Sequence, residues 1–319
     1  MPSSVLLPIP VLKMVKMSCW LFILSLNCIL NSYPVALCAQ NNTSLFDAYM
    51  NGQTELYGFN GNVLVSKNGN VIYTKSFGFA DYNTKKELED NSVFDCGSIA
   101  KEFTAMGMII TSTGDLLKWD RALKNHSLLT ETTQREMLSQ QSEKTFPKVS
   151  FGYGMIVGKN DFGNYIFHIG YYPGYKSMHI RYTDVVVTVI VLSNNESPSD
   201  FIADGLSAIV LNKNIILPYV HKETIRSVGS DKYGGKYMMQ LTRPPYMAVF
   251  PIEFVKRNDT LYVHPGNGPD IMLKPESENF YFFADGTDQQ IEFETANNGS
   301  PSRVWHIAWG VKKELKKMK

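Results

Sequence analysis

Cysteine and histidine are scarce in this chain, and their scarcity excludes two kinds of site. Of the four cysteines among 319 residues, Cys19, Cys28 and Cys38 lie near the N-terminus, which leaves only Cys96 in the rest of the chain. A single cysteine cannot form an intramolecular disulfide, so we expect no disulfide framework. The six histidines are scattered without the paired spacing of a zinc site. We therefore expect no metal and no cofactor, and we interpret Cys96 as a small core residue.

An excess of charge of either sign is also absent. The chain carries 31 Lys and Arg against 30 Asp and Glu, a net charge of +1. This balance gives no reason to expect a nucleic-acid partner, because a nucleic-acid groove needs a clustered excess of basic residues. The lysines at 312, 313, 316, 317 and 319 are predicted to form a solvated tail.

Long hydrophobic runs are missing as well. The apolar run from Cys19 to Leu30 is short for a transmembrane helix. It follows Lys13 and Lys16 and precedes Ala36-Leu37-Cys38-Ala39, which is the arrangement of a secretory signal peptide. Residues 1–39 are therefore predicted to export the protein to the periplasm or the cell exterior, with no integral membrane span in the mature chain. A lipoprotein anchored at Cys38 is the alternative, although Leu37 stands where a small residue is preferred.

Two regions with different patterns follow the predicted signal. Residues 40–213 mix β-branched runs with helical stretches, residues 214–232 form a polar linker, and residues 233–319 contain short strand-like runs separated by turn residues. The last region is predicted to be a small all-β sandwich or barrel. Its expected strands are 247–255, 260–263, 271–273, 280–283, 291–294 and 304–309.

Local signals place several elements in the first region. Asn68-Gly69 predicts a type I′ hairpin turn between two β-branched and aromatic runs. Ser112-Thr113 predicts the capped start of a helix that continues to Leu123. Residues 185–192 are typical of a buried central strand, and residues 198–211 of a helix with proline near its start.

The most informative motif is Ser98-Ile99-Ala100-Lys101, the one Ser-x-x-Lys in the sequence. On a helix, a spacing of three puts both side chains on one face. An amine beside a serine hydroxyl can take up its proton and so activate a poor nucleophile. The apolar residues Phe103, Met106, Met108, Ile109 and Ile110 are expected to anchor this helix in a core.

The surroundings of this motif resemble the serine β-lactamase and penicillin-binding protein superfamily, in particular its class C-like esterases and peptidases. Residues 94–105 match the family phrase around the nucleophile, and residues 59–78 look like its opening hairpin. The resemblance implies an α+β fold: an antiparallel sheet flanked by helices, with two strands before the nucleophile and three after it. It also implies an all-β C-terminal module of the kind appended to many of these hydrolases.

His168-Ile169-Gly170 resembles the third motif of the family, Lys/His-x-Gly. By this resemblance His168 contacts a substrate carboxylate or tunes the proton network. Gly170 permits a close approach of substrate and backbone. The backbone N–H groups of Ser98 and Tyr171 would then form the oxyanion hole.

The helical lobe of the family is missing, and with it the second motif, Tyr-x-Asn. Ile110 runs directly into Thr111 where the family inserts that lobe. Tyr49-Met50-Asn51 has the right letters but lies before the hairpin, in the wrong chain order. Tyr153 or Tyr171 could approach Ser98 instead, although no spacing supports either one.

Two functions follow from this mixture. The first is a serine hydrolase that acts on amides or esters, such as D-amino-acid peptides, β-lactams or small acyl esters, with activity impaired by the missing motif. The second is a non-catalytic exported protein that binds peptidoglycan or another cell-envelope partner. The oligomeric state is left open, and the loss of a lobe should uncover apolar surface around Ser98.

Overall fold

The computed structural model describes residues 42–102, 109–139, 149–224, 230–240, 249–266, 268–296 and 301–318. The predicted signal at residues 1–39 and the apolar residues Phe103, Met106 and Met108 therefore lie outside the described residues. The chain from Phe46 to Lys319 forms one compact unit. Within the described ranges, no helix is both long and apolar enough to cross a bilayer.

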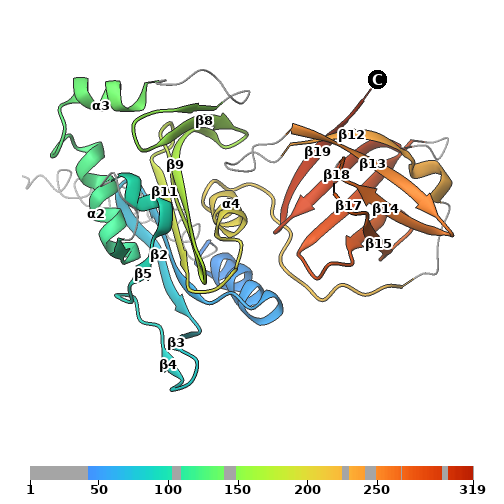
Figure 1. Cartoon of the computed structure of the whole chain (residues 1–319), viewed down its shortest axis with the longest axis horizontal. Helices are drawn as coiled ribbons and strands as arrows, with labels where there is room; N and C mark the ends of the chain where they lie inside the picture. Colours follow the sequence, from blue (N-terminus) through green and yellow to red (C-terminus); the bar gives the residue numbers. More distant parts are fainter. Residues whose placement is uncertain are drawn as a thin grey trace, which may run out of the picture. The chain divides into compact units, whose positions relative to one another are not determined.

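A seven-stranded antiparallel sheet forms the core of the first region (Figure 1). Its order is β2-β1-β11-β10-β9-β8-β7, so the two strands that precede Ser98 pair with the last strand of the region. Every residue of β11 is buried, as expected for a central strand. The strands are β1 Gly61–Lys67, β2 Asn70–Phe77, β7 Val149–Phe151, β8 Ile156–Asn160, β9 Gly163–Tyr172, β10 Tyr175–Tyr182 and β11 Val187–Ser193.

The predicted local signals are confirmed in this sheet, but the strand count is wrong. Asn68 and Gly69 have φ values of 53° and 81°, as a type I′ turn requires. Five strands follow Ser98 rather than three, because residues 149–160 form the edge hairpin of β7 and β8. These edge strands are short and only partly apolar, so periodicity does not reveal them.

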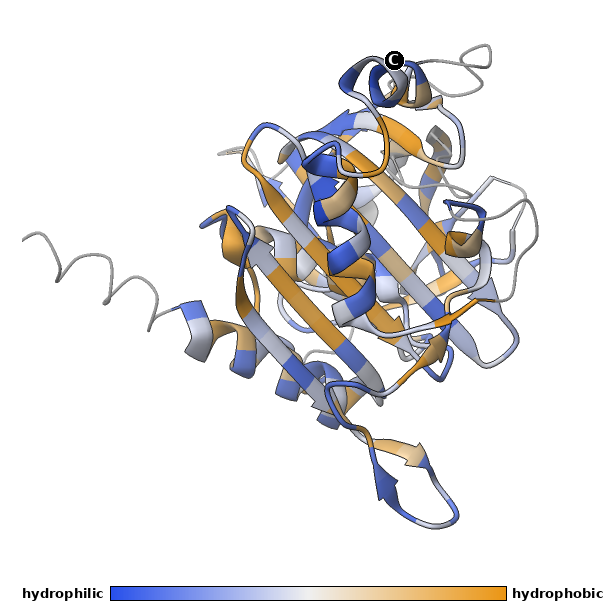
Figure 2. Ribbon diagram, turned by 90° about the vertical axis from the view of Figure 1, so that its left-hand side faces the viewer, coloured by the Kyte–Doolittle hydropathy of each residue, from blue (hydrophilic) through white to orange (hydrophobic). Residues whose placement is uncertain are grey.

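Helices cover both faces of the sheet (Figure 1). On one face lies α2, Thr113–Lys124, whose N-cap Ser112 accepts a hydrogen bond from the Asp115 N–H. On the other lie α4, Ser199–Val210, and helical residues 46–57. The short α3, Glu131–Leu138, follows α2. Hydrophobic segments run along the strands behind the helices (Figure 2), so the sheet buries apolar side chains on both faces.

The second region is a closed barrel of eight antiparallel strands, which confirms the predicted α+β class with an all-β module. Aromatic rings fill its interior; Tyr233 stacks on Phe293 with centroids 4.2 Å apart. The strands are β12 Gly235–Gln240, β13 Val249–Arg257, β14 Thr260–His264, β15 Ile271–Pro275, β16 Phe280–Phe283, β17 Gln289–Thr295, β18 Pro301–Ala308 and β19 Val311–Lys317.

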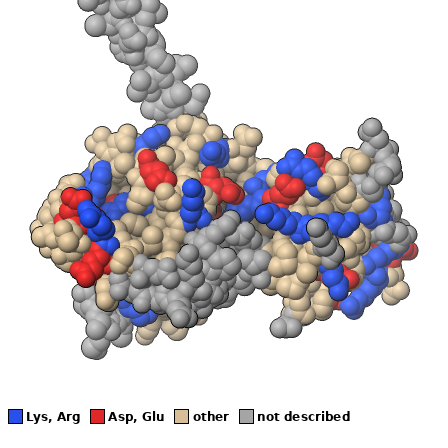
Figure 3. Space-filling model, turned by 90° about the horizontal axis from the view of Figure 1, so that it is seen from above, with Lys and Arg blue, Asp and Glu red and all other residues tan. Residues whose placement is uncertain are grey.

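The lysine-rich C-terminus is not a solvated tail, which corrects the sequence prediction. It forms β19, which pairs with β18 and with β12 and so closes the barrel. Val311 and Leu315 are buried between the lysines, and two inward apolar positions are enough to anchor the strand. Basic and acidic side chains both lie on the surface that Figure 3 shows. On the barrel, Lys312 pairs with Glu292 and Arg303 with Glu314.

Candidate active site

Ser98 and Lys101 lie in a short 3-10 helix, η1, Gly97–Glu102. Lys101 Nζ donates a hydrogen bond to Ser98 Oγ over 2.6 Å. The sequence predicts an α-helix here, but in a 3-10 helix residues three apart are eclipsed, so the serine and the amine align more directly. This pair is a hydroxyl beside an amine that can accept its proton once the amine is deprotonated, the minimal arrangement for a serine nucleophile.

The turn that presents Ser98 depends on Gly97. This glycine has a φ of +52°, and its N–H donates to the Asp95 carboxylate. A Cβ at Gly97 would lie 2.6 Å from the backbone nitrogen of Tyr171. A larger residue would therefore both strain the backbone and push β9 away from the nucleophile. The preceding residues are fixed by a small strand pair, β5 Phe94–Asp95 with β6 Ile110–Thr111.

Gly170 brings the strand end against η1. A Cβ at Gly170 would lie 1.9 Å from the Cys96 carbonyl oxygen and 2.2 Å from Ser177 Oγ. The Ser177 hydroxyl already donates to that carbonyl over 2.9 Å. The glycine is therefore needed for backbone packing within the protein, in addition to any approach of substrate. The contact sets the backbone of Tyr171 beside Gly97, as the predicted oxyanion hole requires.

His168 lies two residues before Gly170 on β9 and is half-buried. Its Nδ1 is 2.6 Å from the Ile169 carbonyl oxygen, which fixes the ring and makes Nδ1 the protonated nitrogen. Burial lowers the pKa of His168, the Glu102 carboxylate raises it, and the Lys101 ammonium lowers it. The His168 ring therefore senses the charges beside the nucleophile.

The residue after Lys101 begins a buried chain of charges that the sequence reasoning misses. Glu102 is buried, and its Oε1 lies 3.5 Å from His179 Nδ1. On the other side of the imidazole, Nε2 lies 3.4 Å from Asp120 Oδ1. The Trp119 indole N–H donates to the second Glu102 oxygen over 3.1 Å. His179 is thus held between two carboxylates at ion-pair distances.

Asp120 continues this chain to Arg181. Arg181 Nη1 donates to Asp120 Oδ1 over 2.9 Å, and the Thr188 hydroxyl donates to the other carboxylate oxygen over 2.8 Å. Burial opposes the ionised form of Asp120, yet His179 and Arg181 hold its pKa below the usual range. Burial likewise opposes the charged form of His179, but Glu102 and Asp120 raise its pKa to about 9. The chain Glu102–His179–Asp120–Arg181 alternates in charge and balances formally to zero.

A sequence signal for this chain exists on β10. Ser177, His179 and Arg181 alternate with the buried residues Met178 and Ile180, and all five positions are buried. Polar residues at every second position of a strand that is buried on both faces require buried partners. The acidic partners come from η1 and α2, elements far away in sequence, so the pairing itself is not readable from the chain.

None of the tyrosine substitutes considered from the sequence is hydrogen-bonded to Ser98 Oγ within the described residues. Among the described residues, Ser98 Oγ is hydrogen-bonded to Lys101 and to no tyrosine hydroxyl. Tyr153 and Tyr171 have exposed side chains. Tyr49 is buried in the helical residues 46–57, where its hydroxyl lies against Gly205 of α4.

The surface beside η1 is open and rich in exposed apolar side chains. Ile110 is 68% exposed and lies on strand β6, so it does not anchor a buried helix as the sequence suggests. Tyr153, Tyr171 and Tyr172 are also exposed. This surface fits the expected effect of losing the helical lobe, which would cover the cleft in the family.

Cys96 is fully buried with a free thiol, and burial raises its pKa to about 11. The thiol is therefore inert, as expected for a core residue. Within the described ranges, no three His, Cys, Asp or Glu side chains converge as metal ligands would.

Comparison with known proteins supports the family suggested by the motifs. A family model described as Beta-lactamase matches residues 105–212, which include β9, β10, β11 and α4. Over 66 residues the chain is 38% identical to Penicillin-binding protein 4* of Bacillus subtilis (strain 168). That match covers 21% of this chain and 15% of the relative, so the chain corresponds to a small part of that protein.

A solved structure extends the likeness in fold to most of the chain. The octameric penicillin-binding protein homologue from Pyrococcus abyssi superposes with a TM-score of 0.52 at 15% identity. The superposition covers 86% of this chain and 99% of that one. Together these matches support a serine β-lactamase and penicillin-binding protein-like superfamily through residues 105–212, and the likeness in fold extends over most of the chain. The family-model match begins four residues after Lys101, so the roles of Ser98 and Lys101 rest on their geometry.

Proposed function

We propose that the protein is a serine hydrolase that forms an acyl-enzyme on Ser98. The observation that carries this proposal is the 2.6 Å hydrogen bond from Lys101 Nζ to Ser98 Oγ. The packing of Gly170 against Cys96 supports it, because the backbone nitrogen of Tyr171 lies beside Gly97, the residue before Ser98. The proposed functional domain spans residues 40–213, and residues 214–232 link it to an accessory domain at 233–319.

The chemistry follows from these groups. Lys101 as the free amine takes the proton of Ser98 Oγ while that oxygen attacks the substrate carbonyl carbon. The N–H groups of Ser98 and Tyr171 stabilise the oxyanion. The carbonyl carbon then expels the amine or alcohol, which receives the proton from Lys101. A water molecule, deprotonated by the same amine, releases the acid and restores Ser98.

The missing tyrosine shifts the whole proton transfer onto Lys101. General acid–base assistance is typically worth about 10²- to 10⁴-fold in rate. Acylation by activated substrates needs little help for the leaving group, whereas amides need much more. We therefore expect reactive esters and β-lactams to acylate Ser98 and D-amino-acid peptides to turn over slowly. Export by residues 1–39 would bring the protein to peptidoglycan-derived substrates.

The test is the intact mass of the protein after exposure to a fluorophosphonate and, separately, to penicillin. We expect one adduct per chain, absent in Ser98→Ala and retained in Ser127→Ala, a change at an exposed serine on the α2–α3 loop. Lys101→Met should slow adduct formation strongly while leaving the protein folded, because Lys101 is exposed. An adduct that persists in Ser98→Ala, or no adduct at all, would refute the proposal.

The alternative is a non-catalytic exported protein that binds peptidoglycan or another cell-envelope partner. The observation that favours it is the direct run of Ile110 into Thr111, which removes the lobe and the Tyr-x-Asn motif. Pull-down on insoluble peptidoglycan separates the two readings. Retention by Ser98→Ala as strong as by the parent, together with no adduct in the parent, would support the binding protein.

A further inference from the structure

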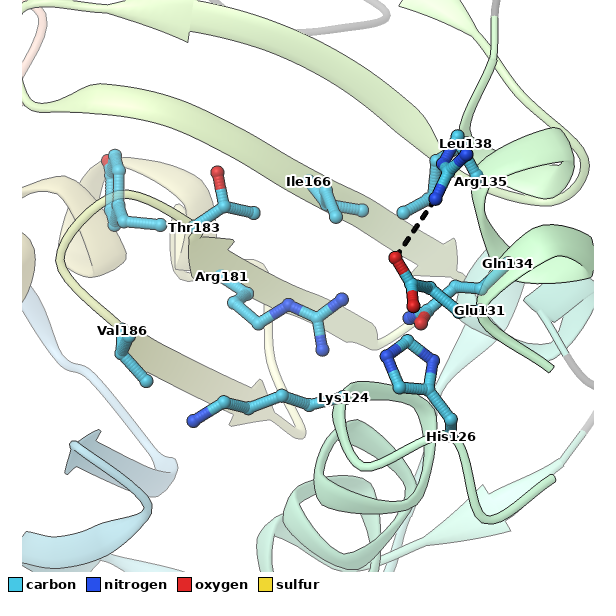
Figure 4. Close-up of a pocket in the computed structure, with 11 residues that line it drawn as sticks. Lys124, His126, Glu131, Gln134, Arg135, Leu138, Ile166, Arg181, Thr183 and Val186 are labelled. Carbon is cyan, nitrogen blue, oxygen red and sulfur yellow. Dashed lines mark hydrogen bonds and ion pairs between the residues drawn. The ribbon is translucent and has the colours of Figure 1, made fainter. Parts of the chain in front are cut away.

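A cavity of about 260 Å³ lies on the helix side of the sheet, away from Ser98 (Figure 4). It is bounded by the C-terminal end of α2, by α3 and by the ends of β9 and β10. Its volume is near the lower end of the range for small-molecule pockets, about 300–1,000 Å³. The cavity is lined by Lys124, His126, Glu131, Gln134, Arg135, Leu138, Ile166, Arg181, Tyr182, Thr183 and Val186.

The register of β9 and β10 separates this cavity from the nucleophile. Gly170 pairs with Ser177 at the η1 end, and Ile166 pairs with Arg181 at the cavity end. Between them lies the pair His168 and His179, of which His179 contacts Glu102 and Asp120. None of the residues that line the cavity belongs to the proposed catalytic group, so the cavity is a distinct site.

Cationic groups dominate the polar lining, and some of them lack partners. Arg181 is nearly buried and is held from behind by Asp120, so its guanidinium is fixed where it meets the cavity. The acid of the lining, Glu131, is already paired with Arg135 at 2.9 Å. The side chains of Lys124 and His126 have no hydrogen bond or ion pair with any described residue. The Lys124 ammonium thus faces the cavity without a described carboxylate partner, and the Arg181 guanidinium is paired with Asp120 behind it.

The backbone of His126 adds a second indication. His126 has a φ of +55°, and it is the residue after the C-cap of α2. Its N–H donates to the Leu123 carbonyl and the Ser127 N–H to the Ala122 carbonyl, which is the pattern of a Schellman motif. Glycine is preferred at this position because it adopts positive φ without strain. A histidine here is held in a less favourable conformation that directs its ring to the cavity wall (Figure 4).

We propose that this cavity binds a small amphiphilic carboxylate. The carboxylate would lie among Lys124, His126 and the fixed Arg181 guanidinium. The apolar part would contact Leu138 and Ile166, which line the same cavity. A carboxylate suits this lining better than a neutral ligand, because charge-assisted hydrogen bonds to lysine and arginine are stronger than neutral ones. The ligand could be a product of hydrolysis or another acid, since both share this chemistry.

Hexanoate, with hexanamide as a neutral analogue of equal shape, tests the proposal on the full chain. Two-dimensional NMR titration should show saturable hexanoate binding, with shifts at residues of α2, α3 and β10. Hexanamide should bind at least about fivefold more weakly, and salt should weaken hexanoate binding. Equal affinity for the amide, or no saturation, would overturn the proposal.

Matched variants locate the site. Lys124→Met should weaken hexanoate binding about three- to fivefold through loss of an exposed charge contact, and His126→Asn should weaken it by a similar factor through loss of the imidazole hydrogen bond. Asparagine also tolerates positive φ, so the second variant keeps the helix end intact. Lys118→Met, on the same helix but outside the cavity, should change nothing. Ser98→Ala should bind hexanoate normally; loss of binding in that variant would place the ligand at the nucleophile and contradict the proposal.

Discussion

The two regions of the protein each bury a histidine, and the two rings are protonated differently. His179 in the sheet lies between Glu102 and Asp120, and its pKa is raised to about 9 despite full burial. His306 in the barrel is buried as completely, but burial lowers its pKa to about 4 and no carboxylate offsets that effect. Its Nε2 lies 3.0 Å from the neutral Gln289 Oε1.

This difference shows that neighbours, and not burial alone, decide the charge of a buried group. The barrel interior consists of aromatic and aliphatic side chains and keeps its histidine neutral. The sheet region instead holds a charged chain one residue from Lys101, where it can fix η1 and set the local potential. Four predictions test this contrast between the two buried histidines and their surroundings.

The largest effect is expected when the buried chain loses its central acid. Asp120→Ala leaves Arg181 buried without a counter-charge and protonated His179 with Glu102 alone, which should lower the free energy of unfolding by about 3–5 kcal/mol. Asp115→Ala, on the same helix but exposed, should cost at most about 1–2 kcal/mol, because it removes the Ser112 hydroxyl hydrogen bond to its carboxylate and its ion pair with Lys118. Guanidinium unfolding followed by circular dichroism measures both. Equal losses would mean that the buried chain contributes no more than a surface contact.

The charged state of His179 predicts a loss of stability in mild alkali. The folded pKa of about 9 lies above the ordinary value of about 6.5, so the stabilisation is complete below pH 6.5 and is lost as pH rises through 9. The difference corresponds to about 3 kcal/mol across this window. His179→Gln should be less stable at pH 7 and should lack this dependence. A parent protein whose stability is flat from pH 7 to 9.5 would show that His179 is neutral.

The lowered pKa of His306 predicts that the protein loses stability as the pH falls. Its folded pKa of about 4 lies below the ordinary value, so the unfolded chain takes up a proton first. Stability should therefore be complete above pH 6.5 and fall by about 3 kcal/mol as pH drops to 4. His306→Gln should make the acid limb of the stability curve shallower by that amount. If His306→Gln lost stability at acid pH as steeply as the parent, the loss would be due to protonation of carboxylates instead.

Local signals predict much of the fold, because short-range rules decide turns, caps and buried strands. The Asn68-Gly69 turn, the Ser112 cap and the buried β11 follow from residues adjacent in sequence. The closing strand β19 could not be predicted in this way. Its sequence is mostly lysine, and its two inward apolar residues are buried only when β12 and β18 pair with it in the barrel.

Some residues of the candidate site could likewise be predicted from the sequence, and others could not. Ser98 and Lys101 are readable from their spacing, and Gly170 from its motif. The partners of His179 are not, because Glu102 and Asp120 reach it from η1 and α2 only after the helices pack on the sheet. The one sign of these tertiary contacts in the local sequence is the occurrence of polar residues at alternate positions of a buried strand, here β10.

The smallest expected effect is a change in the pKa of His168, which responds to Glu102 of the buried chain of charges and to Lys101 beside Ser98. Burial lowers the pKa of its ring, Glu102 opposes that shift and Lys101 adds to it. Glu102→Gln should therefore lower the pKa of His168 further, and Lys101→Met should raise it. NMR titration of the His168 ring protons measures both, with Lys118→Met as the control that should leave the curve unchanged.

Because the two variants must shift the curve in opposite directions, a general loosening of η1 cannot imitate the result. Shifts in the same direction would show that His168 responds to burial alone and is not coupled to the charges beside Ser98.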